Sequence, residues 1–130
     1  MKPAIGFLEL SSIAKGIESV DVMMKKSEVE ILYTQAIPRG KFVILIGGEL
    51  AEVEQSMQSG VEFANEILID HFIIPNVHEQ VLPALRSEIK VEDIEAVGVI
   101  ETKDAVDANV NQKLALTRLT MHLERLLPTG

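Results

Sequence analysis

The sequence lacks several residue types on which whole classes of function depend. Its 130 residues include no cysteine and no tryptophan, and only 4% are aromatic. Without cysteine there can be no disulfide framework, no thiolate nucleophile and no conventional zinc or iron–sulfur site, which fits a reducing cytosol. The shortage of aromatic rings removes the stacking surface that most single-strand nucleic-acid binders use.

Positive charge and long apolar runs are also scarce. Twelve Lys and Arg against twenty Asp and Glu give a net charge of −8, which repels phosphate backbones, so we expect no nucleic-acid partner. No run approaches the ~18 apolar residues of a membrane span, and no signal-peptide pattern is present, because a strand-like run containing Glu9 directly follows Lys2. We therefore expect a cytoplasmic protein without a membrane segment.

Residues suited to catalysis or metal binding are not gathered into a motif. His71, His78 and His122 fall on a predicted strand, a turn and a terminal helix, without HxxxH or HExxH spacing. The pair Ser11-Ser12 lacks a nucleophile elbow and is better explained as the N-cap of a helix. A Ser-His-Asp triad is unsupported by the sequence but not excluded by it. We predict no metal, no cofactor and no enzymatic activity.

The spacing of apolar residues predicts the element order β-α-β-β-α-β in the first 74 residues. The predicted strands cover 4–10, 28–37, 42–46 and 67–74, and the predicted helices cover 13–24 and 49–66. This order is typical of the α+β ferredoxin-like sandwich, in which both helices cover one face of a four-stranded antiparallel sheet. A short third helix is expected over 78–86.

The beginning of the chain is echoed near its end. The first strand contains AIGFLE at 4–9, and AVGVIE follows at 96–101, but only the 35 residues from 96 to 130 are left for a second copy. We therefore expect one complete domain at 1–90 and an extension at 91–130, with a strand at 96–101 and a helix at about 104–127. A leucine stripe on that helix suits packing on its own domain or on other copies.

The tip between the second and third strands, AIPRGK at 36–41, has two interpretations. It is a plain hairpin turn, in which Pro38 fixes φ and Gly40 supplies a positive φ. Alternatively, it faces a symmetry axis and presents a ring of repeated positive charge to passing anions. The residues alone leave both open.

Over residues 4–86 the chain resembles the bacterial microcompartment shell proteins, which form polyhedral coats around metabolic enzymes. The likeness lies in AIGFLEL, SIAKGIESVDVMMKKSEVEI, PRGKFVILIGG and DHFIIPNVHEQVLPAL, in this order and spacing. Such domains assemble as flat cyclic hexamers, or as trimers when one chain holds two domains, and these tile into a layer. The resemblance implies a homo-hexamer, with a trimer less expected, that packs with other shell proteins in a microcompartment shell.

The same resemblance assigns roles to individual residues. An edge lysine late in the first helix corresponds to Lys25, and an edge position frequently held by arginine corresponds to Asn76, after Pro75. The pore of such a ring would be lined by the hairpin loop: Ala36, Ile37, Pro38, Arg39, Gly40 and Lys41. Because the usual glycine-serine tip is replaced here, we expect a narrower and more positive pore that passes small anionic metabolites.

The resemblance is greatest to two subgroups, the tandem-domain shell proteins of propanediol utilisation and the glycyl-radical-associated shell proteins. Some of these hold an iron–sulfur cluster at the pore through a Cys-Pro-Gly turn. Here that turn reads Pro38-Arg39-Gly40, so we expect no cluster. An alternative from another class stays open: a small-molecule-sensing regulatory domain, since βαββαβ modules also bind effectors between subunits.

Overall fold

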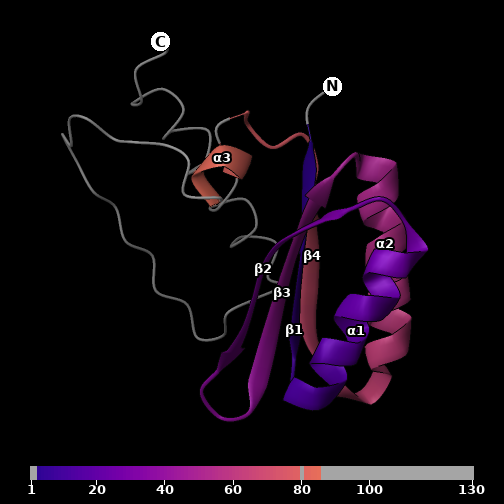
Figure 1. The fold of residues 1–130 in the computed structure, drawn as a ribbon, viewed down its shortest axis with the longest axis vertical. Coiled ribbons are helices and arrows are strands. Elements are labelled where there is room, and N and C mark those ends of the chain that lie inside the picture. The colour runs from indigo at the N-terminus through magenta and orange to yellow at the C-terminus, as the bar shows by residue number, and fades with distance from the viewer. Residues whose placement is uncertain (1–2, 80, 86–130) are drawn as a thin grey trace, which may run out of the picture.

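Two helices cover one face of a four-stranded antiparallel sheet (Figure 1). The computed structural model describes residues 3–79 and 81–85. The strands are β1 (Ala4–Leu10), β2 (Glu30–Ile37), β3 (Lys41–Gly48) and β4 (Leu68–Ile74). The helical elements are α1 (Ile13–Lys26), α2 (Leu50–Ala64), the 3-10 helix η1 (Asn65–Ile67) and α3 (Val81–Leu85). The predicted β-α-β-β-α-β order is confirmed.

The strands lie in the order β2-β3-β1-β4, so the two central strands are β3 and β1. Every neighbouring pair is antiparallel, with Leu8 of β1 opposite Ile44 of β3 and His71 of β4. Helix α1 packs toward the β3 and β2 side of the sheet, and α2 packs toward β1 and β4. This arrangement confirms the predicted ferredoxin-like sandwich.

Several element boundaries differ from those predicted. The second strand begins at Glu30 instead of 28, and the third begins at Lys41. Helix α2 ends before Asn65, whose positive φ of 47° breaks the helical path and leads into η1, so the fourth strand starts one residue later than predicted. The third helix has five residues, from Val81 to Leu85, and is shorter than expected.

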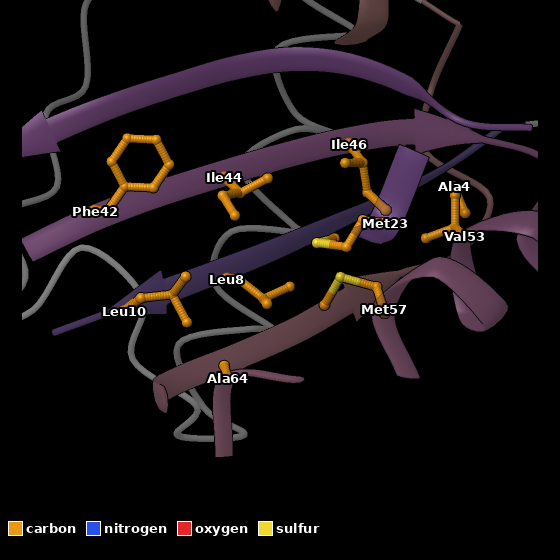
Figure 2. Packing of buried hydrophobic residues seen from close by; sticks show 10 residues of the cluster. All are labelled: Ala4, Leu8, Leu10, Met23, Phe42, Ile44, Ile46, Val53, Met57 and Ala64. Atoms are coloured by element: carbon orange, nitrogen blue, oxygen red, sulfur yellow. The ribbon is translucent and has the colours of Figure 1, made fainter. Parts of the chain in front are cut away.

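The main core lies between the sheet and the two helices (Figure 2). Alternate residues of β1 and β3 point toward the helices, because side chains alternate between the faces of a strand. Met23 of α1 and Met57 of α2 fill the space between these strands and the helices. The buried members of this cluster are Ala4, Leu8, Leu10, Met23, Phe42, Ile44, Ile46, Val53, Met57 and Ala64.

A second apolar cluster lies on the sheet face opposite α1 and α2. The rings of Phe7 and Phe72 stack there with centroids 5.7 Å apart. Helix α3 contributes Val81 and Leu82, and it lies on this side of the sheet in Figure 1. The buried members are Ile5, Leu45, Phe72, Ile74 and Val77. Strands buried on both faces explain why β1 and β3 read as continuous apolar runs and not as alternating ones.

Helix α1 begins where its sequence predicts and extends two residues further than predicted, to Lys26. The Ser12 hydroxyl accepts a hydrogen bond from the Lys15 backbone N–H at 3.2 Å, which confirms the predicted N-cap. The helix is followed by its C-cap residue Ser27, whose hydroxyl donates to the carbonyl oxygen of Glu52 in the first turn of α2 at 2.6 Å. That bond holds the C-terminus of α1 beside the N-terminus of α2.

The part of the chain after residue 85 lies outside the described residues. The predicted linker, the strand at 96–101, the helix at about 104–127 and the division at residue 90 therefore stay predictions.

Candidate functional site

The predicted pore loop is a tight hairpin with three residues beyond the last strand pair. Ile37 of β2 pairs with Lys41 of β3, so the tip consists of Pro38, Arg39 and Gly40, all of which are exposed. Gly40 has φ of 71°, as the sequence predicted, and Arg39 also has a positive φ, of 70°. A side chain in this region is strained, typically by about 1 kcal/mol. The tip therefore presents Arg39 to solvent on a strained backbone.

The second predicted cation of the loop, Lys41, occupies a different environment. It is the first residue of β3, and its Nζ lies 3.9 Å from Oε1 of Glu9 on β1. The Lys41 side chain is 25% exposed, whereas the Glu9 side chain is fully buried. Across the sheet, Glu9 is opposite Asp70 of β4, so two acids and one lysine gather beside the base of the hairpin. The charge of Lys41 is thus largely balanced from within the protein.

The two predicted edge residues lie at the opposite end of the sheet from the hairpin. Ser27 and Glu52 connect the end of α1, which carries Lys25, to the helix that follows Gly48 of β3. Gly48 pairs with Ala4 at the start of β1. Asn76 lies at this same end, because the neighbouring Val77 N–H donates to the Pro3 carbonyl oxygen at 2.8 Å.

The length of β1 sets the separation between the hairpin and the edge residues. The strand runs from Ala4, at the end that holds Lys25 and Asn76, to Leu10, which pairs with Phe42 one residue from the hairpin base. Seven residues at the rise of a strand span about 20 Å. The structure therefore brings residues 36–41 together and separates them from Lys25 and Asn76.

Lys25 and Asn76 also differ in their local environment. The Lys25 Nζ lies 2.8 Å from Oδ2 of Asp21, one turn earlier on α1, and both side chains are mostly exposed. An exposed pair of this kind contributes little to stability. Asn76 has a positive φ of 53° and is exposed. Both residues are accessible to a neighbouring molecule.

Ser11, His71 and His78 were considered above for catalysis or metal binding, and the structure shows where each of them lies. The Ser11 hydroxyl donates to the Ile67 carbonyl oxygen at 3.2 Å, which joins the start of α1 to η1. His71 lies exposed on β4, and His78 lies between β4 and α3. Within residues 3–79 and 81–85, no three His, Asp or Glu side chains are grouped to hold a metal ion. No helix in this same part of the chain has the length and apolarity to cross a bilayer.

Sequence reasoning missed the role of Glu9. A carboxylate inside an apolar strand is a signal in itself, since buried charges are paired. Its partner could not be identified from sequence spacing, because Lys41 is 32 positions away and reaches it only through the pairing of β1 with β3. The positive φ of Arg39 was also missed, since Gly40 was the expected residue for that conformation.

Comparisons with a family model and with individual proteins agree on one family. The model of the BMC domain matches residues 4–77. The bacterial microcompartment shell protein PduT of Citrobacter freundii is 42% identical over 102 residues, which are 78% of this chain and 55% of that protein. The carboxysome shell protein CcmK3 of Synechocystis sp. is 32% identical over 68% of this chain and 90% of that protein.

A solved structure agrees with these sequence relatives. The crystal structure of a microcompartment protein from Desulfitobacterium hafniense has a TM-score of 0.69 and 38% identity, and it covers 72% of this chain and 52% of that chain. The chain thus spans about half the length of PduT and of this solved protein. Because the family model covers more than half of the sequence and the fold agrees, the chain belongs to the BMC domain family.

Proposed function

We propose that this protein is a non-catalytic building block of a bacterial microcompartment shell in the cytoplasm. Its copies form a cyclic ring, and rings pack edge to edge with each other and with other shell proteins. The observation that carries this proposal is the placement of the hairpin tip and of Lys25 and Asn76 at opposite ends of the sheet. That placement is what a disc needs, with one end at the axis and the other at the perimeter.

In the proposed ring the tips of the β2–β3 hairpins surround a central pore. The hairpin is short, and Pro38 fixes one of its φ angles, so its residues can hold a defined opening. Each copy would contribute one Arg39 to the rim, giving a ring of positive charge that attracts small anionic metabolites. The ion pair with Glu9 supports a position for Lys41 in the wall below the rim instead of at the rim itself.

We propose a homo-hexamer over a trimer, because the resemblance to shell proteins implies six copies when each chain contributes one domain. The match to CcmK3, which covers 90% of that protein, supports a unit of single-domain size. The mass of the native assembly in solution decides the number directly.

Electron microscopy of the concentrated full chain tests the shell function. Negative-stain images should show hexagonal discs, sheets or tubes, and native mass spectrometry should give six times the mass of the 14.3 kDa chain. A protein that stays a monomer or small dimer at every concentration contradicts the proposal. A melting temperature that rises with one particular metabolite in such a small species would indicate a ligand-binding regulator instead.

Exchange through the pore needs a separate test. The variant Arg39→Glu replaces the proposed ring of positive charge with a ring of negative charge. We expect assembled shells of this variant to pass small anions more slowly than wild-type shells, with the passage of a neutral solute of the same size unchanged. Equal anion passage in both would contradict anion selection by Arg39.

A further inference from the structure

The sheet has a second apolar face, on the side away from α1 and α2, called here the far face. It carries the stacked rings of Phe7 and Phe72, together with the buried side chains of Leu45 and Val43. An antiparallel sheet with one face in water usually alternates apolar and polar residues along its strands. The central strands β1 and β3 are largely apolar on both faces. The far face therefore has the composition of a surface that another layer covers.

Helix α3 covers only one end of the far face. A Cβ at Gly47 would lie 3.0 Å from Cδ2 of Leu82, so α3 lies over the end of β3 that is remote from the hairpin. Val43 comes four residues earlier, about 13 Å along the strand. The five residues of α3 span only about 8 Å. Among residues 3–79 and 81–85, the side chains outside the sheet that pack on this apolar cluster are Val77, Val81 and Leu82.

The half of the far face beside the hairpin is nevertheless closed at its centre. One row of side chains crosses the four strands there: Gln35, Val43, Glu9 and Asp70. The outer members reach solvent, since Gln35 is exposed and Asp70 is half-buried. The central members do not, since Val43 is 2% exposed and Glu9 is fully buried. Neighbours in the same sheet lie beside these side chains and not over them, so this pattern indicates a further layer over the middle of the row.

The chain itself continues from this side of the sheet. Helix α3 ends at Leu85, and the sequence runs on to residue 130. The first part of this stretch, residues 86–108, is rich in acids, which the carboxylates of Glu9 and Asp70 would repel. These acids are Glu88, Glu92, Asp93, Glu95, Glu101, Asp104 and Asp107. Residues 86–108 are therefore a poor cover for the row.

Residues 109–127, called here the leucine segment, have the opposite character. Their charged residues are Lys113, Arg118, Glu124 and Arg125, so the segment is positive within a chain of net charge −8. On a helix, one side of the segment carries these leucines: Leu116, Leu119, Leu123 and Leu126. From the first leucine to the last, such a helix extends about 15 Å, which fits within the roughly 20 Å length of β1.

We infer that the leucine segment is an amphipathic helix that lies on the far face of its own domain, with its four leucines turned toward β1 and β3. Its apolar side covers the hairpin half that α3 does not reach. Its basic residues lie near an end of the sheet that holds two carboxylates, of Glu9 and Asp70, and the one ammonium group of Lys41. The domain then has three layers, with the sheet between helices on both faces.

A single introduced cysteine reports whether the far face is covered, because the chain has no cysteine of its own. Val43→Cys places a thiol on the far face. Val53→Cys is the matched reporter, since it places a thiol of the same size in the main core under α2. In the otherwise unchanged full chain, both thiols should react slowly with a water-soluble disulfide reagent.

Charge introduced into the leucine segment should uncover only the first reporter. With Leu119→Glu and Leu123→Glu, we expect the Val43→Cys thiol to react roughly tenfold faster or more, through local opening, and the Val53→Cys thiol to react as before. The matched control, Thr117→Glu with Met121→Glu, adds the same charge on the opposite side of the predicted helix and should change neither rate. Equal rates of the Val43→Cys thiol in the leucine variant and in this control overturn the inference.

Milder substitutions keep the comparison decisive if the two glutamates unfold the domain, which an accelerated Val53→Cys thiol would reveal. Leu119→Ala with Leu123→Ala then replaces the leucine variant, and Thr117→Ala with Met121→Ala replaces the control. The Val43→Cys thiol should again react faster in the leucine variant alone. Acceleration of both thiols together in this milder variant overturns the inference, because the leucine segment would then act on the whole fold.

Mixing distinguishes a segment of the same copy from a segment of a neighbouring copy. Chains that carry Val43→Cys with the two leucine substitutions are unfolded and refolded with an excess of wild-type chains. We expect the thiol to stay fast, because the segment that belongs to its own domain is still displaced. A return to the slow rate would mean that another copy covers the far face, which overturns the inference.

The inference goes beyond the proposed ring and does not depend on it. Thiol reaction rates are read equally well on monomers and on rings. A chain that never assembles therefore contradicts the shell function and leaves this test in force, whereas a far face that is open in an intact ring contradicts the inference alone.

Discussion

The Nζ of Lys41 lies 3.9 Å from Oε1 of the fully buried Glu9. This pair joins the base of the β2–β3 hairpin to the central strand β1, one strand away. It has two consequences: the start of β3 is held against the sheet, and Arg39 is left as the cation at the exposed tip.

Removing the ammonium group of Lys41 should lower the free energy of unfolding more than removing the charge of Glu9. Lys41→Met leaves the buried charge of Glu9 without this neutralising partner, and we expect a loss of about 2 kcal/mol in the free energy of unfolding, less than for a fully buried pair because Lys41 is partly exposed. Glu9→Gln keeps the shape and removes the charge, so it should cost less. Urea unfolding of both single variants and of the double variant measures the interaction free energy between Lys41 and Glu9. Equal stability of Lys41→Met and the wild-type protein would contradict a stabilising role for this pair.

The positive φ angles of the hairpin tip predict different changes in stability for substitutions at Arg39 and Gly40. Gly40 has a positive φ and no atom within 4 Å of an added Cβ, so Gly40→Ala is opposed by backbone strain alone and should cost about 1 kcal/mol. Arg39→Gly removes the same strain at its neighbour and should not destabilise the protein. Thermal unfolding compares the two, and a stabilising Gly40→Ala would show that the tip does not need this conformation.

The contact of Gly16 with Phe42 should reverse the usual effect of glycine in a helix. Replacing a helix glycine with alanine normally stabilises by about 1 kcal/mol. Here a Cβ would lie 2.5 Å from Cδ2 and 2.9 Å from Cβ of the buried Phe42, so the whole helix would have to move. We expect overpacking to outweigh propensity, with a net loss of about 1 kcal/mol from Gly16→Ala in urea unfolding. A gain in stability would mean that α1 is free to shift.

Substitutions of the two adjacent lysines at the end of α1 distinguish the packing of rings into sheets from the formation of each ring. If Lys25 forms the contact between rings, Lys25→Ala should abolish sheets in electron micrographs while native mass spectrometry still gives the ring. Lys26→Ala is the matched control and should form sheets as wild type does. Because the ion pair of Lys25 with Asp21 is exposed, neither variant should change the melting temperature by more than a degree or so. Sheets formed normally by Lys25→Ala would exclude it from that contact.

The fold was predictable because its signals are local. The Ser12 cap, the apolar runs of β1 and β3 and the stripe of α2 each follow from neighbouring residues, and their order limits the topology to few choices. The spacing of apolar residues on α1 was less informative. Ile13 and Ile17 have helical spacing, yet the helix buries Gly16 and Ser19. Tertiary packing selects the buried face there, because only small residues let α1 approach Phe42.

The candidate site was predictable only in part. The hairpin at 36–41 follows from Pro38 and Gly40 in their local sequence, but its charge balance depends on Glu9, which is distant in sequence. Lys25 and Asn76 lie at the same end of the sheet because of the strand directions and the hydrogen bond between Ser27 and Glu52. Such relations arise only when the sheet has formed.

The close approach of Gly16 to Phe42 has a mechanical consequence. Phe42 pairs with Ala36 at the base of the hairpin, and Gly16 belongs to α1, the helix that carries the proposed edge residue Lys25. In the proposed ring, a tilt of α1 would be transmitted through this contact to the base of the hairpin. If the copies form that ring, the diameter of the proposed central opening would change with the tilt of α1, and bending the proposed shell layer would widen or constrict it.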